Sequence, residues 1–206
     1  MDKERLDRQF DFCREIDKEK FIQRQTYKSD ALTKENDAEH AWHMAIMTIL
    51  LGEYSNEPID ILKTVTMLLI HDIVEIDAGD TYAYDVEGKA TQRAREEAAA
   101  DRIFAILPKD QGQKFRALWE EFEAYETAEA KFAHAMDNIQ PMMLNDVTKG
   151  KSWLEKGVKI SQVLGRNKKT DQGSKELWNY AYNNILLPNV NEGKIINDIE
   201  AEGDTN

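Results

Sequence analysis

The dipeptide His71-Asp72 places an imidazole and a carboxylate within the most apolar stretch of the chain, between the runs TMLLI and IV. An unpaired carboxylate in an apolar interior costs several kcal/mol, so Asp72 needs either a partner or a hydrated cleft. A divalent cation is one such partner. The other interpretation is an aspartate satisfied at a helix end beside a core histidine, and the dipeptide alone favours it.

Two more residues of ligand type interrupt apolar helical patterns elsewhere. His40 lies in the segment AEHAWH and Asp137 lies in the segment AHAMDN. With His71 and Asp72 they allow three helices to converge on one ion, because polar side chains on three apolar faces are costly unless something pairs them. Two imidazoles and two carboxylates suit one Mn, Fe, Co, Ni or Mg ion in octahedral geometry. Two positions then stay open for water or substrate, which indicates a catalytic metal.

Helices are the elements expected to position these residues. Apolar residues between positions 39 and 54 recur every three or four residues, after an expected N-cap at Asp37. A more apolar helix is expected from Pro58 to Gly79, and another begins after an N-cap at Thr127 and bends at Pro141. Without the alternating β-branched pattern of strands, the sequence predicts an all-α fold. The remaining helices are expected at residues 6–21, 90–107, 110–125, 152–164 and 175–186.

Length and composition indicate a single folded domain. The chain has 206 residues, of which 41% are hydrophobic and 32% are charged, as is typical of globular proteins. We expect a domain over residues 1–190 and a polar tail over residues 191–206. No apolar run reaches the roughly 18 residues that cross a bilayer, and the charged N-terminus is unlike a secretory signal, so a cytoplasmic protein without a membrane partner is expected. The single Cys13 excludes an internal disulfide and a thiolate zinc site.

The formal net charge of −12 opposes binding along DNA or RNA, because phosphate contacts need clustered Lys and Arg. We therefore expect no polymeric nucleic acid as a partner. The segment from Lys149 to Lys169 differs from the rest, with seven basic residues and one acidic residue, Glu155. It is either a solvated basic surface or a local aid to binding a small anion.

The order of the four ligand-type residues resembles that of the HD-domain metal-dependent phosphohydrolases. Neighbouring phrases narrow the resemblance to the YfbR-like 5′-deoxynucleotidase branch: EHAW at 39–42, HDIVE at 71–75 with GD at 79–80, LWEEFE at 118–123, and DNIQP at 137–141. The resemblance extends from about residue 20 to about residue 170. It implies an all-helical HD fold, a homodimer, and hydrolysis of a small phosphate monoester such as a nucleoside 5′-monophosphate.

The resemblance also implies roles for individual residues. Glu75 matches the acidic residue near the attacking water, and helix geometry permits this because Glu75 follows His71 by four residues and Asp72 by three. Asp80 matches a residue near the substrate sugar, although a loop or capping aspartate is an equal interpretation. Arg24 matches an arginine that contacts the substrate. Four residues match the metal ligands: His40, His71, Asp72 and Asp137.

The chain departs from the family pattern directly after this arginine. Trp can follow the arginine in the family, whereas this chain reads Arg24-Gln25-Thr26-Tyr27. Tyr27 could provide the missing stacking surface for the substrate, or it could be a hydrogen-bonded core tyrosine.

Four other residues of chemical interest are interpreted as structural. His43 and His134 each lie one turn from an expected ligand, but dinuclear relatives add an adjacent histidine pair that this chain lacks. We therefore expect one metal ion per chain. Arg93 and Arg95 are expected to form ion pairs with Glu96 and Glu97 on a helix surface, with a phosphate clamp as the less favoured interpretation.

The expected function is hydrolysis of nucleoside or deoxynucleoside 5′-monophosphates by a metal-activated water. Glu75 would orient or deprotonate this water, and Arg24 would hold the phosphate. Two alternatives remain. One is an HD-fold pyrophosphohydrolase or triphosphohydrolase whose extra phosphates bind the basic segment, and the other is a nucleotide-binding regulatory module without catalysis.

Overall fold

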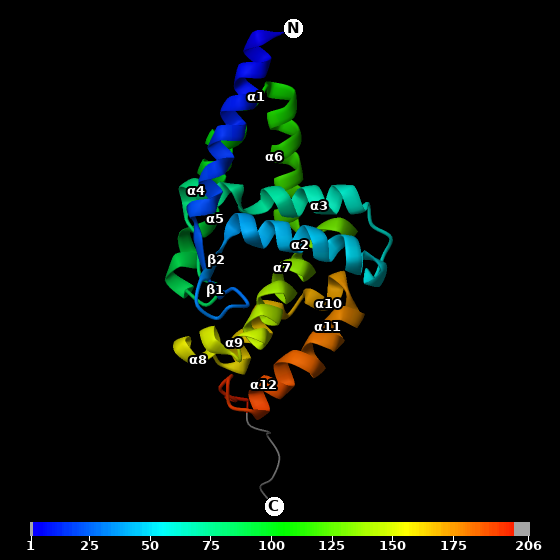
Figure 1. The fold of residues 1–206 in the computed structure, drawn as a ribbon. Helices are drawn as coiled ribbons and strands as arrows, with labels where there is room; N and C mark the ends of the chain where they lie inside the picture. The colour runs from blue at the N-terminus through cyan, green and yellow to red at the C-terminus, as the bar shows by residue number, and fades with distance from the viewer. Residues whose placement is uncertain (1, 200–206) are drawn as a thin grey trace, which may run out of the picture.

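The computed structural model describes residues 2–199, which form a helical protein with one small sheet (Figure 1). The prediction of an all-α fold is confirmed. Within the described range, no helix is both long and apolar enough to pass through a membrane. The α-helices are α1 (Lys3–Glu15), α2 (Asp37–Leu51), α3 (Ile61–Ile70), α4 (Glu75–Ala78), α5 (Val86–Phe104), α6 (Lys109–Ala124), α7 (Ala128–Val147), α8 (Lys151–Lys156), α9 (Ile160–Asn167), α10 (Thr170–Gly173), α11 (Lys175–Ala181) and α12 (Leu187–Asn191).

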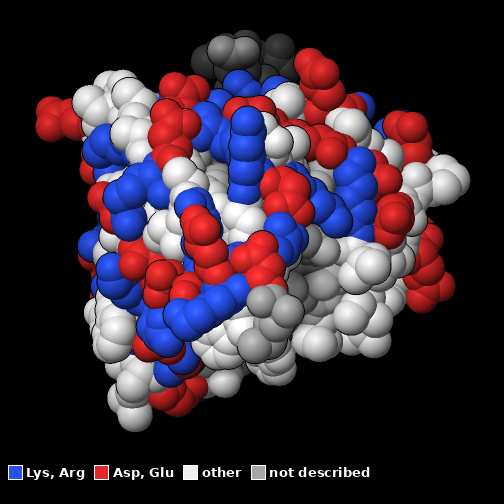
Figure 2. Space-filling view, turned by 90° about the horizontal axis from the view of Figure 1, so that it is seen from above, with Lys and Arg blue, Asp and Glu red and all other residues white. Residues whose placement is uncertain are grey.

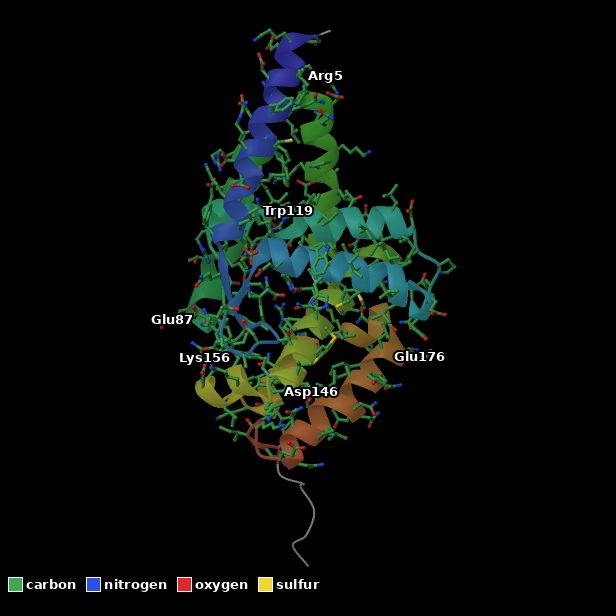
Figure 3. All side chains as sticks on the ribbon, viewed as in Figure 1. Arg5, Glu87, Trp119, Asp146, Lys156 and Glu176 are labelled. Atoms are coloured by element: carbon green, nitrogen blue, oxygen red, sulfur yellow. The ribbon has the colours of Figure 1, made fainter. Side chains whose placement is uncertain are left out.

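Helix α7 lies at the centre of the fold. It packs against α2, α3, α6 and α10, and its Phe132 and Met136 side chains are completely buried. In Figure 1, α2 and α3 run side by side across the middle, α1 and α6 project at one end, and α8 to α12 gather at the other. A second core lies between α1, α5 and α6, where Figure 3 shows Trp119 close to the junction of α6 with α3.

The end from which α1 and α6 project is highly charged. Seen from this end in Figure 2, acidic and basic side chains are interspersed on the surface. Arg5 of α1, for example, forms an ion pair with Asp110 of α6 at 2.7 Å. This face therefore has no continuous positive area of the kind that nucleic-acid backbones bind.

A two-stranded antiparallel sheet precedes α2, although the sequence pattern predicts no strand. Strand β1 (Gln23–Tyr27) pairs with β2 (Lys34–Asn36), with Gln23 opposite Asn36 and Tyr27 opposite Lys34. The strands are short and polar, so they lack the alternating apolar pattern by which strands are recognised. The sheet carries Arg24 toward the middle of the protein.

The first turn of α2 is fixed by a capping box one residue earlier than expected. Asn36, rather than Asp37, is the N-cap: its side chain accepts a hydrogen bond from the Glu39 backbone N–H, and the Glu39 side chain accepts one from Asn36 N–H. Asp37 becomes the first helical residue and is completely buried. His40 follows within the same first turn.

The predicted helix from Pro58 to Gly79 is divided into three parts. Helix α3 begins after the N-cap Asp60, a 3₁₀ turn covers His71–Val74, and α4 ends at Gly79, whose φ is +74°. All residues of the 3₁₀ turn are buried. The polar dipeptide His71-Asp72 thus lies inside the protein, where each polar group needs a partner.

The C-terminal part contains more breaks than the sequence pattern predicts. The helix expected at residues 152–164 is interrupted at Gly157, which adopts a φ of +58° and separates α8 from α9. Beyond α12, Ile195 is 1% exposed, and Ile196 hydrogen-bonds to the backbone of Val158 and Ile160. Ile195 thus packs into the core and Ile196 is joined to the backbone of Val158 and Ile160, so residues beyond the expected boundary at 190 contact the rest of the chain. Residues 200–206 of the expected tail lie outside the described residues.

Candidate metal centre

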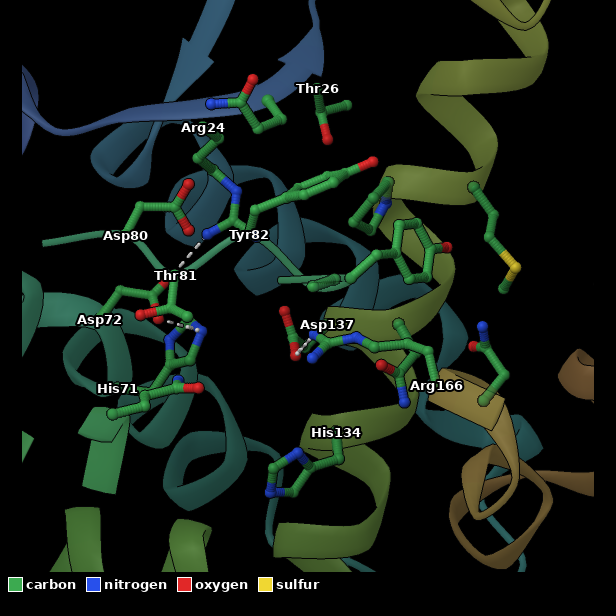
Figure 4. A pocket seen from close by; sticks show the side chains of 18 of the residues that line it. Arg24, Thr26, His71, Asp72, Asp80, Thr81, Tyr82, His134, Asp137 and Arg166 are labelled. Atoms are coloured by element: carbon green, nitrogen blue, oxygen red, sulfur yellow. Dashed lines mark hydrogen bonds and ion pairs between the residues drawn. The ribbon is translucent and has the colours of Figure 1, made fainter. Parts of the chain in front are cut away.

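Three helical segments bring the four predicted metal ligands together, and His71, Asp72 and Asp137 line a pocket (Figure 4). His40 comes from α2, His71 and Asp72 from the 3₁₀ turn after α3, and Asp137 from the middle of α7. Single ligand atoms of His40, His71 and Asp72 all lie within 4.8 Å of one another. Oδ1 of Asp137 lies 3.1 Å from Nε2 of His40. The structure thus places all four side chains in one group.

Hydrogen bonds to both histidines turn their free nitrogens toward carboxylates. Nδ1 of His40 is 2.9 Å from Oε1 of Gln140, and Nδ1 of His71 is 2.9 Å from the Leu68 carbonyl oxygen. Each Nδ1 therefore donates its proton to an oxygen, and each Nε2 is directed at a carboxylate. Although burial opposes the charged form, these carboxylates raise the pKa of both histidines, that of His71 to about 9, so both rings can carry a second proton when no ion is bound. Nε2 of His40 faces Asp137, while the buried Nε2 of His71 lies 3.1 Å from Oδ1 of Asp72 without forming a hydrogen bond. Two imidazole nitrogens and two carboxylates directed at one another form a mixed nitrogen and oxygen donor set, in which a divalent metal ion would replace the Nε2 protons, so this donor set fits such an ion.

The two carboxylates in the group are held in the charged form. Burial by itself raises the pKa of Asp72, but the neighbouring His71 and Arg24 lower this pKa to about 2. Burial also opposes ionisation of Asp137, yet Arg166 and His40 hold its pKa well below the usual range. Both side chains therefore offer the anionic oxygens that a divalent cation needs.

Arg24 contacts the group from β1. Its Nη1 lies 2.9 Å from Oδ2 of Asp72 and 3.3 Å from Oδ1 of Asp37, and its Nε lies 3.9 Å from Oε2 of Glu35. Only 13% of the Arg24 side chain is exposed. The predicted substrate-binding arginine thus lies at the site, but a large part of its charge is balanced by buried carboxylates.

Glu75 lies on the same side as Asp37. It is 6% exposed, and its Oε2 has no hydrogen-bond partner within the described chain. Burial and the charges of Asp72 and Asp37 raise the pKa of Glu75 well above its usual value. A carboxyl in this environment readily holds a proton, as a general acid or base requires.

The pocket has a volume of about 350 Å³. Asp80, directly after Gly79, lines it, and burial raises the pKa of this carboxyl. Tyr27 does not line the pocket: its hydroxyl donates to Glu155 at 3.0 Å, and its ring lies under Lys151. Three other tyrosines form part of the wall, and the sequence pattern did not identify them: Tyr82, Tyr84 and Tyr125.

A family model described as HD domain matches residues 16–178 of the chain, a range that contains every member of the metal group. The chain belongs to the HD domain family.

Known proteins similar to this HD domain chain include curated relatives and a solved structure. Human 5′-deoxynucleotidase HDDC2 is 30% identical over 109 residues, which are 53% of this chain and 52% of that protein. The Xenopus laevis 5′-deoxynucleotidase HDDC2 is 28% identical over 60% of this chain and 57% of its own length. The chain thus spans about half the length of the curated relatives it matches. A crystal structure of a predicted metal-dependent phosphohydrolase from Magnetospirillum magnetotacticum MS-1 is 46% identical, covers 93% of this chain and 95% of that chain, and has a TM-score of 0.88.

The other two histidines of the HD domain have partners of their own. Nδ1 of His43 is 3.1 Å from the Gln140 side-chain amide nitrogen. The His134 ring stacks on Phe122 at 3.9 Å between centroids, and its Nε2 is 2.9 Å from the Phe122 carbonyl oxygen. Among the described residues, His40, His71 and Asp72 are the one group of three or more His, Cys, Asp or Glu side chains whose ligand atoms lie within 4.8 Å of one another.

The two arginines of α5 differ from each other. Arg93 forms the expected surface ion pairs, with Glu97 at 2.8 Å and with Glu123 at 2.9 Å. The expectation for Arg95 is wrong: its guanidinium donates to the Ala78 carbonyl and, at 2.8 Å, to the Thr81 hydroxyl. Arg95 therefore holds the loop between α4 and α5 instead of pairing with a glutamate.

Proposed function

We propose that this HD domain chain hydrolyses nucleoside or deoxynucleoside 5′-monophosphates with one divalent metal ion. The observation that carries the proposal is the pair of histidine Nε2 atoms facing Asp72 and Asp137 beside an open pocket. The printed names of the relatives, 5′-deoxynucleotidase and predicted metal-dependent phosphohydrolase, support the choice of reaction.

His40, His71, Asp72 and Asp137 would hold the ion. When bound, a Mn, Co, Ni, Fe or Mg ion supplies Lewis acidity, which lowers the pKa of a water and neutralises charge on phosphoryl oxygens. The Gln140 side chain and the Leu68 carbonyl accept from Nδ1 of the two imidazoles, so Nε2 is the nitrogen of each ring that would lose its proton and bind the ion.

Glu75 would take the proton from the attacking water. Its unpartnered Oε2 is available to accept a hydrogen bond, and its raised pKa brings it closer to the pKa of an effective general base at neutral pH. Besides burial and the charge of Asp72, the nearby charge of Asp37 raises the pKa of Glu75 and so favours the protonated form. Asp80 lies in the pocket wall, where it would contact the sugar.

The remaining wall suits a nucleoside. Tyr82 and Tyr84 lie edge to face with ring centroids 5.3 Å apart, and Tyr125 lines the same pocket. Aromatic faces of this kind stack on nucleobases, and the pocket volume of about 350 Å³ is within the range of small-molecule sites. These tyrosines, in place of Tyr27, are the proposed stacking surface.

Phosphate release from ribo- and deoxyribonucleoside mono-, di- and triphosphates, each with Mn, Co, Ni and Mg, tests the proposal. We expect release from monophosphates, and none after chelation or in His71→Ala. Preferential cleavage of triphosphates would favour the pyrophosphohydrolase or triphosphohydrolase alternative, for which Lys168 and Lys169 line the pocket. Saturable nucleotide binding without any release would favour a regulatory module.

We also infer that the chain forms a homodimer through the outer faces of α2 and α3. These two helices pack side by side (Figure 1), and they expose large apolar side chains that most monomers bury. On α2 these are Trp42 at 64%, Ile46 at 41%, Ile49 at 59% and Leu50 at 65%, and on α3 they are Leu62 at 76% and Leu69 at 43%.

A further inference from the structure

Arg166 reaches the metal group from the side opposite Arg24 (Figure 4). It comes from α9, within the basic segment between Lys149 and Lys169. Its Nη2 donates to Oδ2 of Asp137 at 3.0 Å, whereas Oδ1 of the same carboxylate faces His40. Two guanidinium groups from distant parts of the chain thus flank the four ligand side chains.

The two arginines differ in how much of their hydrogen-bonding capacity is free. Arg24 is 13% exposed and lies near three carboxylates, those of Asp72, Asp37 and Glu35. Arg166 is 33% exposed and contacts one carboxylate. In the described part of the chain, Nε and Nη1 of Arg166 have no hydrogen-bond partner, so most of its five N–H donors are available to a pocket ligand.

The charge of the pocket requires such a donor. Six carboxyl groups line its wall: those of Asp72, Glu75, Asp80, Glu96, Glu123 and Asp137. A phosphate monoester carries up to two negative charges, and these carboxylates would repel it unless cations compensate. The charge of Arg24 is largely neutralised by buried carboxylates, so Arg166 is the arginine whose charge and N–H donors are available to the phosphate. Two further cations line the pocket just beyond it, at Lys168 and Lys169.

We propose that Arg166 binds the phosphoryl oxygens of the substrate while one of its nitrogens holds Asp137. A guanidinium can do both, because its planar fork presents separate edges to two anions. Arg24 and Arg166 then hold the phosphate from opposite sides. The inference rests on the proposed function, since it concerns the phosphate of the same substrate.

The test is calorimetric titration of inorganic phosphate into the metal-loaded protein, with metal content measured on the same samples. The test variants are Arg166→Gln and Arg166→Lys. The control is Arg14→Gln, which removes one arginine at a distance from the pocket. Arg14 is a surface residue paired with Asp11. We expect Arg166→Gln to weaken phosphate binding at least tenfold, as the loss of a charged hydrogen bond does, while metal content stays at the wild-type level.

Arg166→Lys should recover part of the affinity, because it restores the charge without the fork. Arg14→Gln should bind phosphate like the wild type. In turnover, Arg166→Gln should raise KM for the monophosphate more than it lowers kcat. Unchanged phosphate affinity in Arg166→Gln would overturn the inference, and so would loss of the metal in that variant, because Arg166 would then act only through Asp137.

Failure of the proposed function gives a different result. If the wild type releases no phosphate from any nucleotide, the proposed function fails, whereas the phosphate titration does not depend on turnover. If the wild type is active and Arg166→Gln binds phosphate normally, only the role of Arg166 fails.

Discussion

Glu75 has an unpartnered carboxyl oxygen in a buried position three residues beyond Asp72. Glu75→Gln keeps the size of the side chain but removes the base, so metal and substrate should still bind. We expect kcat to fall by roughly 10²–10⁴-fold, the usual contribution of a positioned general base. Steady-state kinetics with metal analysis checks this. Loss of the metal would instead make Glu75 a ligand or a support, and normal turnover would transfer the role of base to another carboxylate, such as Asp80.

His134 allows a test of pH dependence at a single residue. Burial lowers its pKa to about 4, below the usual value of about 6.5 in an unfolded chain. Between these values the unfolded chain binds a proton that the folded protein does not, so stability should fall as pH decreases from about 6.5 to about 4, by an amount on the order of 3 kcal/mol. Denaturant unfolding across this range should show a shallower decline in His134→Gln. Parallel profiles for both proteins would contradict the assignment.

Each of the four expected ligands could be proposed from the sequence because it interrupts an apolar helical pattern. Arg166 could not, since its partner Asp137 lies 29 residues earlier and only the tertiary fold brings α9 to α7. The basic segment was the available signal, but composition does not indicate which of its seven charges faces inward. Tyr82 was missed for a similar reason: a loop residue shows no periodicity.

At the scale of elements, the loop between α4 and α5 depends on Arg95. This residue bonds to Ala78 and Thr81 at the start of the loop that carries Asp80 and Tyr82. Arg95→Ala should loosen the pocket wall and raise KM several-fold while leaving metal content unchanged. Arg93→Ala, on the same helix, removes only surface ion pairs and should have little effect on KM. Equal kinetics of the two variants would show that Arg95 does not position the wall.

Helix positions followed from the sequence better than the breaks between them. The N-cap Thr127 was recognisable because its side chain satisfies a free backbone N–H group, whereas the N-cap of α3 is Asp60 and its helix begins three residues after the expected start at Pro58. The hairpin of β1 and β2 was not, because its strands are polar and only three to five residues long. Its position matters nonetheless, since it carries Arg24 to the site.

For the whole molecule, a bound ion would join α2, the 3₁₀ turn after α3, and α7. A ligand that binds only the folded state stabilises it, by about 2.7 kcal/mol at a concentration 100 times Kd. Chelation should therefore lower the melting temperature by about 5–10 °C. His71→Ala should show no response to chelation. An unchanged melting temperature in the wild type after verified metal removal would count against the site.

The exposed apolar side chains of α2 and α3 are the proposed interface of the homodimer. Trp42 and Leu62 are 64% and 76% exposed, and pairing this face with a second copy would remove both from water at a gain of about 25 cal/mol per Å². Light scattering should give about twice the chain mass of 23.8 kDa for the wild type. Trp42→Glu and Leu62→Glu should shift the mass toward the monomer, because each places a charge in the buried interface. Leu154→Glu, a change at a 55% exposed leucine of α8, should leave the dimer intact. A wild-type monomer at micromolar concentration would contradict the predicted dimer. A dimer that Leu154→Glu disrupts and Trp42→Glu does not would show that the interface lies elsewhere.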